Sequence, residues 1–235
     1  DQVDLNSGTC LLRPTPHSST TDPTPCGYTG GVDLKFPHHE NQIAQAEAHF
    51  DCCEGASWVN YFLHSGHLQI EGLKMSKSLK NFITIRQALD ANGKHAARRI
   101  RLMFLLQPWD QPINYSDQTL DEAKAREKTL ASYFAAVERE LKSYLSRPTK
   151  PTQLEIDLRA KLDARRARVH ERLCDNFDTA GAMAELFGII ADANVYLRDA
   201  PRADALLLRA GASYITRILR AVGLVAQDEF GFPSK

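Results

Sequence analysis

The chain has 235 residues, of which 43% are hydrophobic and 25% charged, and its 29 basic and 29 acidic side chains give a formal net charge of zero. Such a chain can bury one large core or two modest ones, and its composition excludes a disordered or collagen-like protein. The sequence contains no run of eighteen apolar residues, so it predicts no membrane span. No apolar segment follows a basic N-terminus, so it predicts no secretory signal. Any anionic partner must therefore meet a local basic patch rather than a global field.

The five cysteines contain no Cys-x-x-Cys pair. A disulfide framework and a zinc knuckle are therefore both unsupported by the spacing, and a reducing, cytosolic setting is favoured.

The first part of the chain changes character at Gly30. Residues 1–29 are rich in Ser, Thr, Pro and Gly without periodicity, which predicts loop or disorder. A short strand is then expected over Val32–Phe36. Pro37 is expected to open a helix from His38 to about Phe50, because its fixed φ suits a first helical turn.

Two β-rich runs follow, over residues 58–63 and 67–70. Glu71-Gly72 is expected to turn the chain into a basic loop, and Thr84 to cap a helix that runs through Leu89. The region up to about residue 92 thus has a mixed α/β pattern.

From Lys94 onward the pattern is helical only. Apolar residues between Ala97 and Leu105 form one helical face, and Ser116 is expected to cap a long helix. Arg147–Pro151 resembles a linker. Three further helices are expected over residues 153–174, 179–199 and 203–222. The predicted fold class is therefore α/β followed by all-α, with an antiparallel helical bundle.

The basic loop, Gly72–Asn81, carries lysines at positions 74, 77 and 80 and two serines. Ammonium groups on a flexible loop suit oxygens whose charge moves during phosphoryl or adenylyl transfer. The segment is not a P-loop, since no GxxxxGK[ST] pattern is present. On charge pattern alone a solvated lysine-rich turn is the better interpretation.

The particular residues change this interpretation. Lys74–Ser78 reads KMSKS, the second signature of class I aminoacyl-tRNA synthetases. Gly30–Asn41 resembles the GGxDLxFPHHEN segment of cysteinyl-tRNA synthetases, and Trp58–Gly66 resembles their WVNYxxHxG stretch. Lys80 stands where bacterial members usually have glycine. The chain is thereby identified as resembling the eukaryotic cytoplasmic type of cysteinyl-tRNA synthetase, as a partial chain.

The resemblance continues at residues 173–179 and 231–233. It implies that residues 30–92 form the C-terminal part of a Rossmann-type catalytic domain with the KMSKS loop. Residues 93–235 are then a helical bundle of the tRNA-binding kind, while residues 1–29 are unmatched.

The implied activity is ligation of cysteine to its tRNA in the cytoplasm, with cysteine, ATP and cysteine tRNA as partners and no membrane. ATP acts as a substrate together with Mg²⁺. In that scheme Lys77 stabilises charge on the departing pyrophosphate and Lys74 supports it. Asp33 accepts hydrogen bonds from the ATP ribose, and Gly30 and Gly31 allow the backbone to approach the nucleotide. For Asp33 the plain alternative is a turn residue at a strand end.

His64 is the least certain of the implied ATP-binding residues. Proximity to the adenine and a purely structural histidine are equally good interpretations.

Family members also hold Zn²⁺, which is the least secure implication here. His38 matches the histidine ligand, and an i,i+4 spacing places position 42 on the same helix face. Position 42 is Gln42, however, which offers only a neutral carbonyl oxygen where the family has an acidic ligand. Cys10 and Cys26 lie in unmatched sequence, so the ligand count is incomplete.

Neither HIGH nor HMGH, forms of the first class I signature, occurs in the 235 residues. The chain by itself is therefore expected to be inactive in ATP–pyrophosphate exchange. Two other functions stay open: a non-catalytic module that binds tRNA or a protein, and a ligase that joins cysteine to a small amine.

In the helical part, Arg98, Arg99 and Arg101 are candidates for tRNA phosphate contacts, although a solvated helix surface is the preferred interpretation. Phe134, Leu186 and Phe187 are expected in the core.

Overall fold

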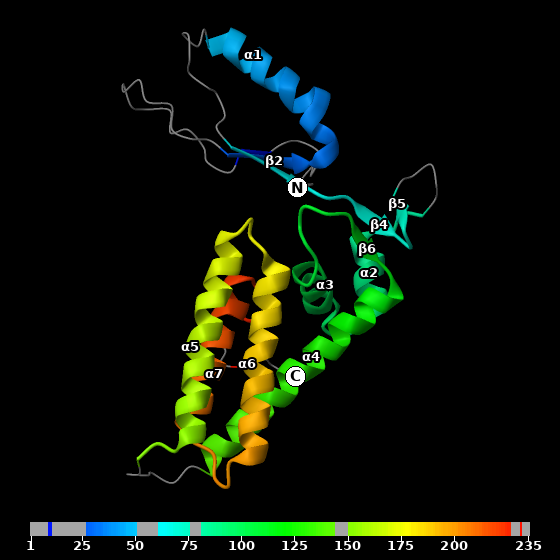
Figure 1. Ribbon diagram of the computed structural model, residues 1–235. Coiled ribbons are helices and arrows are strands. Elements are labelled where there is room, and N and C mark those ends of the chain that lie inside the picture. Colours follow the sequence, from blue (N-terminus) through cyan, green and yellow to red (C-terminus); the bar gives the residue numbers. More distant parts are fainter. Residues whose placement is uncertain are drawn as a thin grey trace. The chain divides into compact units, whose positions relative to one another are not determined.

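The computed structural model describes residues 9–10, 27–50, 61–75, 81–143, 150–226 and 231. The chain is mostly helical, with two small sheets (Figure 1). It divides into two compact units. Unit 1 comprises residues 1–69 and 109–113, and unit 2 comprises residues 70–108 and 114–235.

Unit 1 contains a three-stranded sheet with the order β1-β2-β3. Strand β2 (Gly27–Gly31) pairs antiparallel with β1 (Thr9–Cys10) and parallel with β3 (Tyr61–Ser65). A parallel pair needs a crossover connection, and this one contains the helix α1 (Glu40–Phe50). The register places Gly30 opposite His64.

Two short turns lie between β2 and α1. Val32–Leu34 (η1) is a 3₁₀ turn, and Lys35–His39 (η2) is a wider helical turn interrupted by extended backbone at Phe36. The strand expected over residues 32–36 is therefore wrong, since the strand ends at Gly31. The β-propensity of Val32 and Phe36 is not realised because neither side chain gains a packed face, and Phe36 is 75% exposed.

The expectation of loop over residues 1–29 is also wrong at two places, because residues 9–10 and 27–29 are strands. Residues 1–8 and 11–26 lie outside the described residues, as do residues 58–60 of the predicted strand 58–63.

A second sheet has the order β5-β4-β6, formed by Leu73–Lys74, Leu68–Ile70 and Ile113–Tyr115. The expected turn between β4 and β5 is present, with positive φ at both Glu71 (50°) and Gly72 (79°). The amide of Gly72 donates to Asn114 Oδ1 at 2.9 Å, which holds the turn in place.

Helices begin where the sequence predicted their caps. Thr84 caps α2 (Ile85–Asn92), and Ser116 caps α4 (Asp117–Lys142), each through a capping box with the residue three positions later. Helix α3 (Ala96–Leu105) lies between them in the chain and packs against α4.

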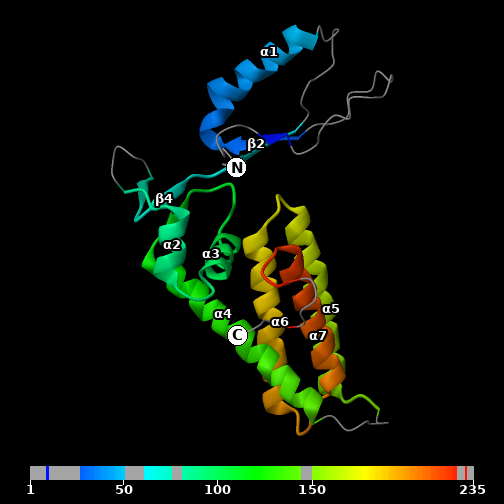
Figure 2. The ribbon, with the colours of Figure 1, turned by 180° about the vertical axis from the view of Figure 1, so that it is seen from behind.

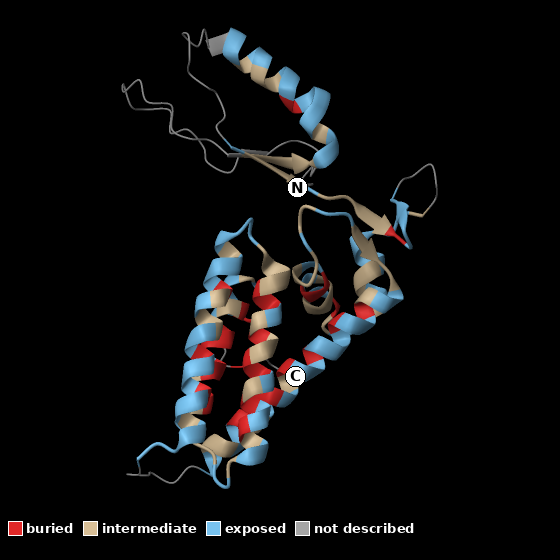
Figure 3. Ribbon diagram, viewed as in Figure 1, coloured by how far each residue is buried: buried red, intermediate tan, exposed pale blue. Residues whose placement is uncertain are grey.

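The bundle of unit 2 consists of α4 with α5 (Gln153–Cys174), α6 (Thr179–Asp199) and α7 (Ala205–Ala221), as Figures 1 and 2 show. The predicted bounds of these last three helices are confirmed to within two residues. Buried residues follow the sides on which the helices meet (Figure 3). The most deeply buried include Leu130, Val137, Val169, Met183, Leu186, Ile190, Leu208, Ile215 and Leu219.

Helix α6 is, by length and composition, apolar enough to cross a membrane, with a mean hydropathy of 1.2 over an 18-residue stretch. Packing accounts for this composition, because 44% of that stretch is buried inside the protein against the other bundle helices. No other helix among the described residues meets the same test.

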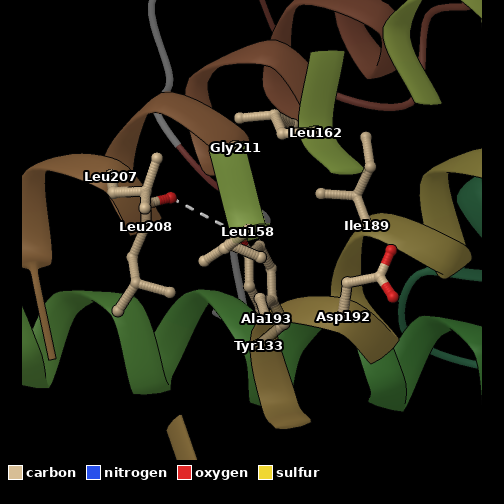
Figure 4. A pocket seen from close by; sticks show the side chains of 9 residues that line it. All are labelled: Tyr133, Leu158, Leu162, Ile189, Asp192, Ala193, Leu207, Leu208 and Gly211. Atoms are coloured by element: carbon tan, nitrogen blue, oxygen red, sulfur yellow. Dashed lines mark hydrogen bonds between the residues drawn. The ribbon is translucent and has the colours of Figure 1, made fainter. Parts of the chain in front are cut away.

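A small apolar void lies between α4, α5, α6 and α7 (Figure 4). The Tyr133 hydroxyl points into this region and donates to the carbonyl of Leu208 at 3.4 Å. A side chain at Gly211 would lie 3.2 Å from that hydroxyl, so the glycine makes room for the tyrosine. Burial raises the pKa of Tyr133, which keeps its hydroxyl protonated.

Helices α3 and α4 are joined by a buried carboxylate. Glu127 accepts from Arg98 Nη2 at 2.7 Å and from Arg99 Nε at 2.5 Å. The preferred interpretation of these arginines as solvated surface is therefore wrong, because both side chains turn inward to the Glu127 carboxylate. Arg101 is exposed, as the solvated-surface interpretation expects, and donates to the Val222 carbonyl at 3.1 Å.

The core predictions for Phe134 and Leu186 are confirmed, since they are 3% and 0% exposed. Phe187 is only partly buried and lies beneath the guanidinium of Arg126, 4.8 Å from its ring centroid.

We expect Glu127→Gln to destabilise unit 2 by about 3 kcal/mol, because removing a buried charge leaves two arginines without their counter-ion. Burial alone would raise the pKa of Glu127, but hydrogen bonds from Arg99 and Arg98 outweigh it and the net pKa is lowered from 4.5. The ion pairs thus add stability above about pH 4.5 that is lost as the pH falls further. Urea unfolding followed by helical circular dichroism measures both effects. Equal stability of the two proteins at pH 7 would contradict the account.

Candidate functional site

The predicted site residues are divided between the parts of the chain. Gly30, Gly31, Asp33, His38 and His64 all lie in unit 1, around the end of β2 and the start of α1. Lys74 lies in unit 2, at the end of β5. The predicted catalytic residue at position 77 lies outside the described residues, together with the rest of the segment 76–80.

The centre of the unit 1 site is a pair of histidines. His39 is 2% exposed, and its Nδ1 lies 2.9 Å from Nε2 of His64, within hydrogen-bond distance. Aromatic rings surround the pair: Tyr28 meets His39 edge-on at 5.6 Å, and Phe62 stacks on His64 at 5.8 Å. Side chains from β2, β3 and the turn before α1 therefore form one small aromatic cluster.

Both histidines favour the neutral form. Burial lowers the pKa of His39, and the neighbouring His64 and His38 lower it further. Burial also lowers the pKa of His64, followed by the nearby charge of Lys35. A neutral pair can share one N–H donor across the Nδ1–Nε2 contact, whereas protonation of both rings would place two donors face to face.

The cluster leaves no room for a side chain at Gly30. A Cβ at position 30 would lie 2.8 Å from Cε1 and 3.2 Å from Nε2 of His39, closer than side chains pack. The buried Nε2 has no hydrogen-bond partner among the described residues, because the ring edge abuts the glycine. Close approach of a nucleotide at Gly30 stays a prediction; close approach of His39 is observed.

Asp33 lies beside Gly31 in the same way that His39 lies beside Gly30. A Cβ at Gly31 would lie 2.7 Å from Asp33 Oδ1, and the same oxygen is 3.3 Å from Nε2 of His67. The Asp33 side chain is 53% exposed, so the carboxylate faces solvent on one side. The carboxylate is therefore held beside Gly31 and His67 with one side open to solvent.

The residues that align with a zinc site do not fit zinc. His38 is exposed, whereas the Oε1 atom of Gln42 is buried and has no hydrogen-bond partner among the described residues. A buried neutral amide cannot supply the charge of an acidic ligand. Within the described ranges, no three His, Cys, Asp or Glu side chains come together to hold a metal.

The base of the lysine loop is closed by a side chain. Asn81 Nδ2 donates to the carbonyl of Lys74 at 3.3 Å, which joins the two ends of the segment that carries the KMSKS sequence. Lys74 is exposed, so its ammonium faces solvent at the start of the loop.

Comparison with known proteins places these features in a family. Residues 27–125 match the profile of the tRNA synthetases class I (C) catalytic domain. The fold resembles LeuRS of Agrobacterium radiobacter K84 in its ternary complex with tRNA and LeuAMS (TM-score 0.67, 17% identity, 84% of this chain and 25% of that one). It also resembles Mycobacterium tuberculosis methionyl-tRNA synthetase bound by methionyl-adenylate (TM-score 0.60, 18% identity, 88% and 45%). Fold and profile agree: the fold is that of the class I aminoacyl-tRNA synthetases, and residues 27–125 match their catalytic domain.

The sequence relatives narrow the class. The chain is 44% identical over 214 residues to the cytoplasmic cysteine–tRNA ligase of Drosophila pseudoobscura pseudoobscura, covering 88% of this chain and 28% of that protein. It is 43% identical over 218 residues to the corresponding protein of Dictyostelium discoideum, covering 88% and 32%. The human protein is 42% identical over 216 residues. The chain belongs to the cysteine–tRNA ligase family and spans about a third or less of the length of these relatives.

Sequence reasoning did not single out His39, Tyr28 or Phe62. The signal that could have found His39 is its place directly after His38 in the motif. On a helical turn, adjacent residues face different ways, so one histidine of the two must turn inward.

We expect the stability of unit 1 to fall as the pH drops below about 6.5, the ordinary histidine value. The folded-state pKa values of His39 and His64 are lowered, so the unfolded chain binds more protons and acid favours unfolding. Trp109 belongs to unit 1 and gives a fluorescence signal for its urea unfolding. His64→Gln, which keeps a polar side chain without a titrating group, should flatten the dependence between pH 5 and 7. An unchanged slope in this variant would contradict the neutral histidine pair.

Proposed function

We propose that this chain forms the KMSKS-bearing part of a cytoplasmic cysteine–tRNA ligase, which activates cysteine with ATP and transfers it to cysteine tRNA. The observation that carries the proposal is the 44% identity to a cytoplasmic cysteine–tRNA ligase over 88% of the chain. In activation, the cysteine carboxylate attacks the α-phosphorus of ATP, and pyrophosphate leaves with the electrons of the broken P–O bond.

The lysine loop supplies positive charge for this step. Lys77 contacts the triphosphate and stabilises the charge that builds on pyrophosphate, alongside Mg²⁺, and Lys74 adds a second charge at the base of the loop. The Asn81 contact with the carbonyl of Lys74 supports this proposal, because it holds together the two ends of the segment that carries the lysines. Such placed charge is the main source of catalysis in phosphoryl and adenylyl transfer.

The nucleotide is held by residues of unit 1. Asp33 accepts hydrogen bonds from the ribose hydroxyls, and its half-exposed carboxylate beside His67 supports that role. Gly30 and Gly31 bring bare backbone to the same edge. His64 lies near the adenine, and its ring stacking on Phe62 and its contact with His39 hold it in position for that role.

The bundle in residues 93–235 contributes to tRNA binding. The fold neighbour LeuRS of Agrobacterium radiobacter K84 is known in a complex with tRNA, which supports this assignment. No step of the proposal runs through zinc, because Gln42 stands where the family has an acidic ligand.

The test is a chimera in which this chain replaces the matched segment of the Drosophila melanogaster cytoplasmic cysteine–tRNA ligase, to which it is 44% identical. The chimera should catalyse cysteine-dependent ATP–pyrophosphate exchange. In that background, Lys77→Ala should lower kcat by about 10²–10³, because it removes charge stabilisation that exists mainly in the transition state.

Lys80→Ala is the matched control, since it removes a lysine from the same loop at a position where bacterial relatives have glycine. Its kcat should stay within about tenfold of the unsubstituted chimera. Equal losses in the two variants would mean that the loop acts only through its net charge, and the role assigned to Lys77 would be wrong.

We expect the 235 residues alone to show no exchange, because they match about a third or less of the relatives and contain neither HIGH nor HMGH. A radiolabelled pyrophosphate assay with cysteine and ATP measures this directly. Exchange above the rate of a sample without cysteine would overturn the expectation.

A further inference from the structure

We propose that the face of the bundle where α5 meets α7, around Tyr214, binds the phosphate backbone of RNA. The face contains an open pocket of about 410 Å³ lined by Arg166, Ala210, Ser213, Tyr214 and Arg217. All of these residues belong to unit 2 and none is a predicted site residue. The identity of the RNA as tRNA rests on the proposed function; the phosphate chemistry rests on the contacts described next.

Two guanidinium groups share one aromatic ring. The Cζ atoms of Arg166 and Arg217 each lie 5.1 Å from the ring centroid of Tyr214. Tyr214 is 8% exposed, and its hydroxyl donates to the Arg166 carbonyl at 3.5 Å, so the ring is a fixed platform. The π-face attracts each cation, but it does not neutralise either charge. Two positive groups held beside one pocket attract an anion between them.

The charges of these arginines are weakly satisfied within the protein. Arg166 makes only long contacts, to Asp163 Oδ1 at 3.4 Å and to the Ala210 carbonyl at 3.3 Å. Its Nε is shut off from solvent without a hydrogen-bond partner among the described residues. Across the described part of the chain, Arg217 makes no ion pair, and its contact is with Tyr214 alone.

The side of α5 that faces α6 shows arginines that are fully paired with acids. Arg165 donates to Glu185 at 2.8 Å and to Asp192 at 2.9 Å, and Arg168 donates to Glu185 at 3.0 Å. Here two carboxylates of α6 face two arginines of α5. On the α7 side, by contrast, Arg166 has only the exposed Asp163 at 3.4 Å, and Arg217 of α7 makes no ion pair within the described residues.

The sequence of α7 extends the positive surface. Residues Ala205–Ala221 include three arginines and no Asp or Glu. Arg209, Ser213 and Arg217 follow one another at four-residue steps and are all exposed, so they share one helix face. Asp163 is the acidic group that approaches Arg166, at 3.4 Å, which leaves the face positive although the whole chain has a net charge of zero.

The geometry favours a polyanion over a single phosphate. Arg209 and Arg217 are eight residues apart on α7 and are therefore separated by about 12 Å along the helix axis, which exceeds the width of one phosphate group. Guanidinium groups bind phosphate oxygens through paired N–H donors, and the Ser213 hydroxyl adds another donor between them. A nucleic-acid backbone, which presents phosphates in series, satisfies all of these groups together. RNA is the nucleic acid that the proposed function requires.

The test measures binding of the full 235-residue chain to a fluorescently labelled cysteine tRNA transcript by anisotropy, over a series of salt concentrations. Arg217→Ala should weaken binding by about tenfold and lower the slope of log K against log salt by about one, because one phosphate contact is lost. Arg166→Ala should have a similar effect. Arg217→Lys, which keeps the charge but loses the paired donors, should fall between Arg217→Ala and the unsubstituted chain.

Arg198→Ala is the matched control. It removes one arginine from the same bundle, but Arg198 is 71% exposed and already paired with Asp199 at 2.7 Å. Its affinity should stay within twofold of the parent chain. Thermal melts of each variant show whether the fold is intact, and Arg217→Lys serves if Arg217→Ala does not fold.

Equal losses in Arg217→Ala and Arg198→Ala would overturn the proposal, because only the overall charge would then matter. Cysteine-dependent exchange by the chimera without tRNA is measured separately. Its failure would count against the proposed function, whereas active exchange with no Arg217 effect on RNA binding would count against this surface alone.

Discussion

The imidazole of His39 fills the space that a side chain at Gly30 would need, and the site end of unit 1 is arranged around this contact. The ring lies 2.8 Å from the position of the missing Cβ and shares a hydrogen bond with His64 on the neighbouring strand. One buried side chain therefore sets how closely the turn before α1 approaches both β2 and β3. Burial lowers the pKa of both histidines, which favours the neutral pair that shares one N–H donor across this contact. Asp33 stands at the edge of this cluster, where its carboxylate reaches solvent.

The arginines of the bundle form two groups, according to whether they face a carboxylate on another helix or an aromatic ring. Arginines that face an acid across a helix interface, such as Arg99 on Glu127 and Arg165 on Glu185, hold the bundle together. Arginines that face an aromatic ring, Arg166 and Arg217 on Tyr214, keep their charge available to an outside partner. The distinction depends on where the carboxylates lie, and so it is a property of the folded bundle rather than of the arginine count.

Local signals in the sequence were sufficient for the helices and their caps. Thr84 and Ser116 initiate helices as predicted because an N-cap acts within four residues of the chain. The strand predicted over residues 32–36 lies instead at Gly27–Gly31. Val32 and Phe36 have high β-propensity but no packed face, whereas Gly30 and Gly31 pair with β3. Arg98 and Arg99 were misjudged because their partner, Glu127, lies on another helix. Contacts between distant segments also explain why His39 was missed, although the motif that contains it was found.

We propose that this chain carries part of a cysteine-specific active site. Gln42 stands where the family has an acidic residue. The choice of amino acid is therefore the most demanding test of that proposal. The most direct measurement is ATP–pyrophosphate exchange by the chimera with cysteine, serine, methionine and leucine supplied in turn. The account predicts that cysteine drives exchange and that the other three give rates close to the background without amino acid. Exchange driven equally well by methionine or leucine, or by none of the four, would contradict it.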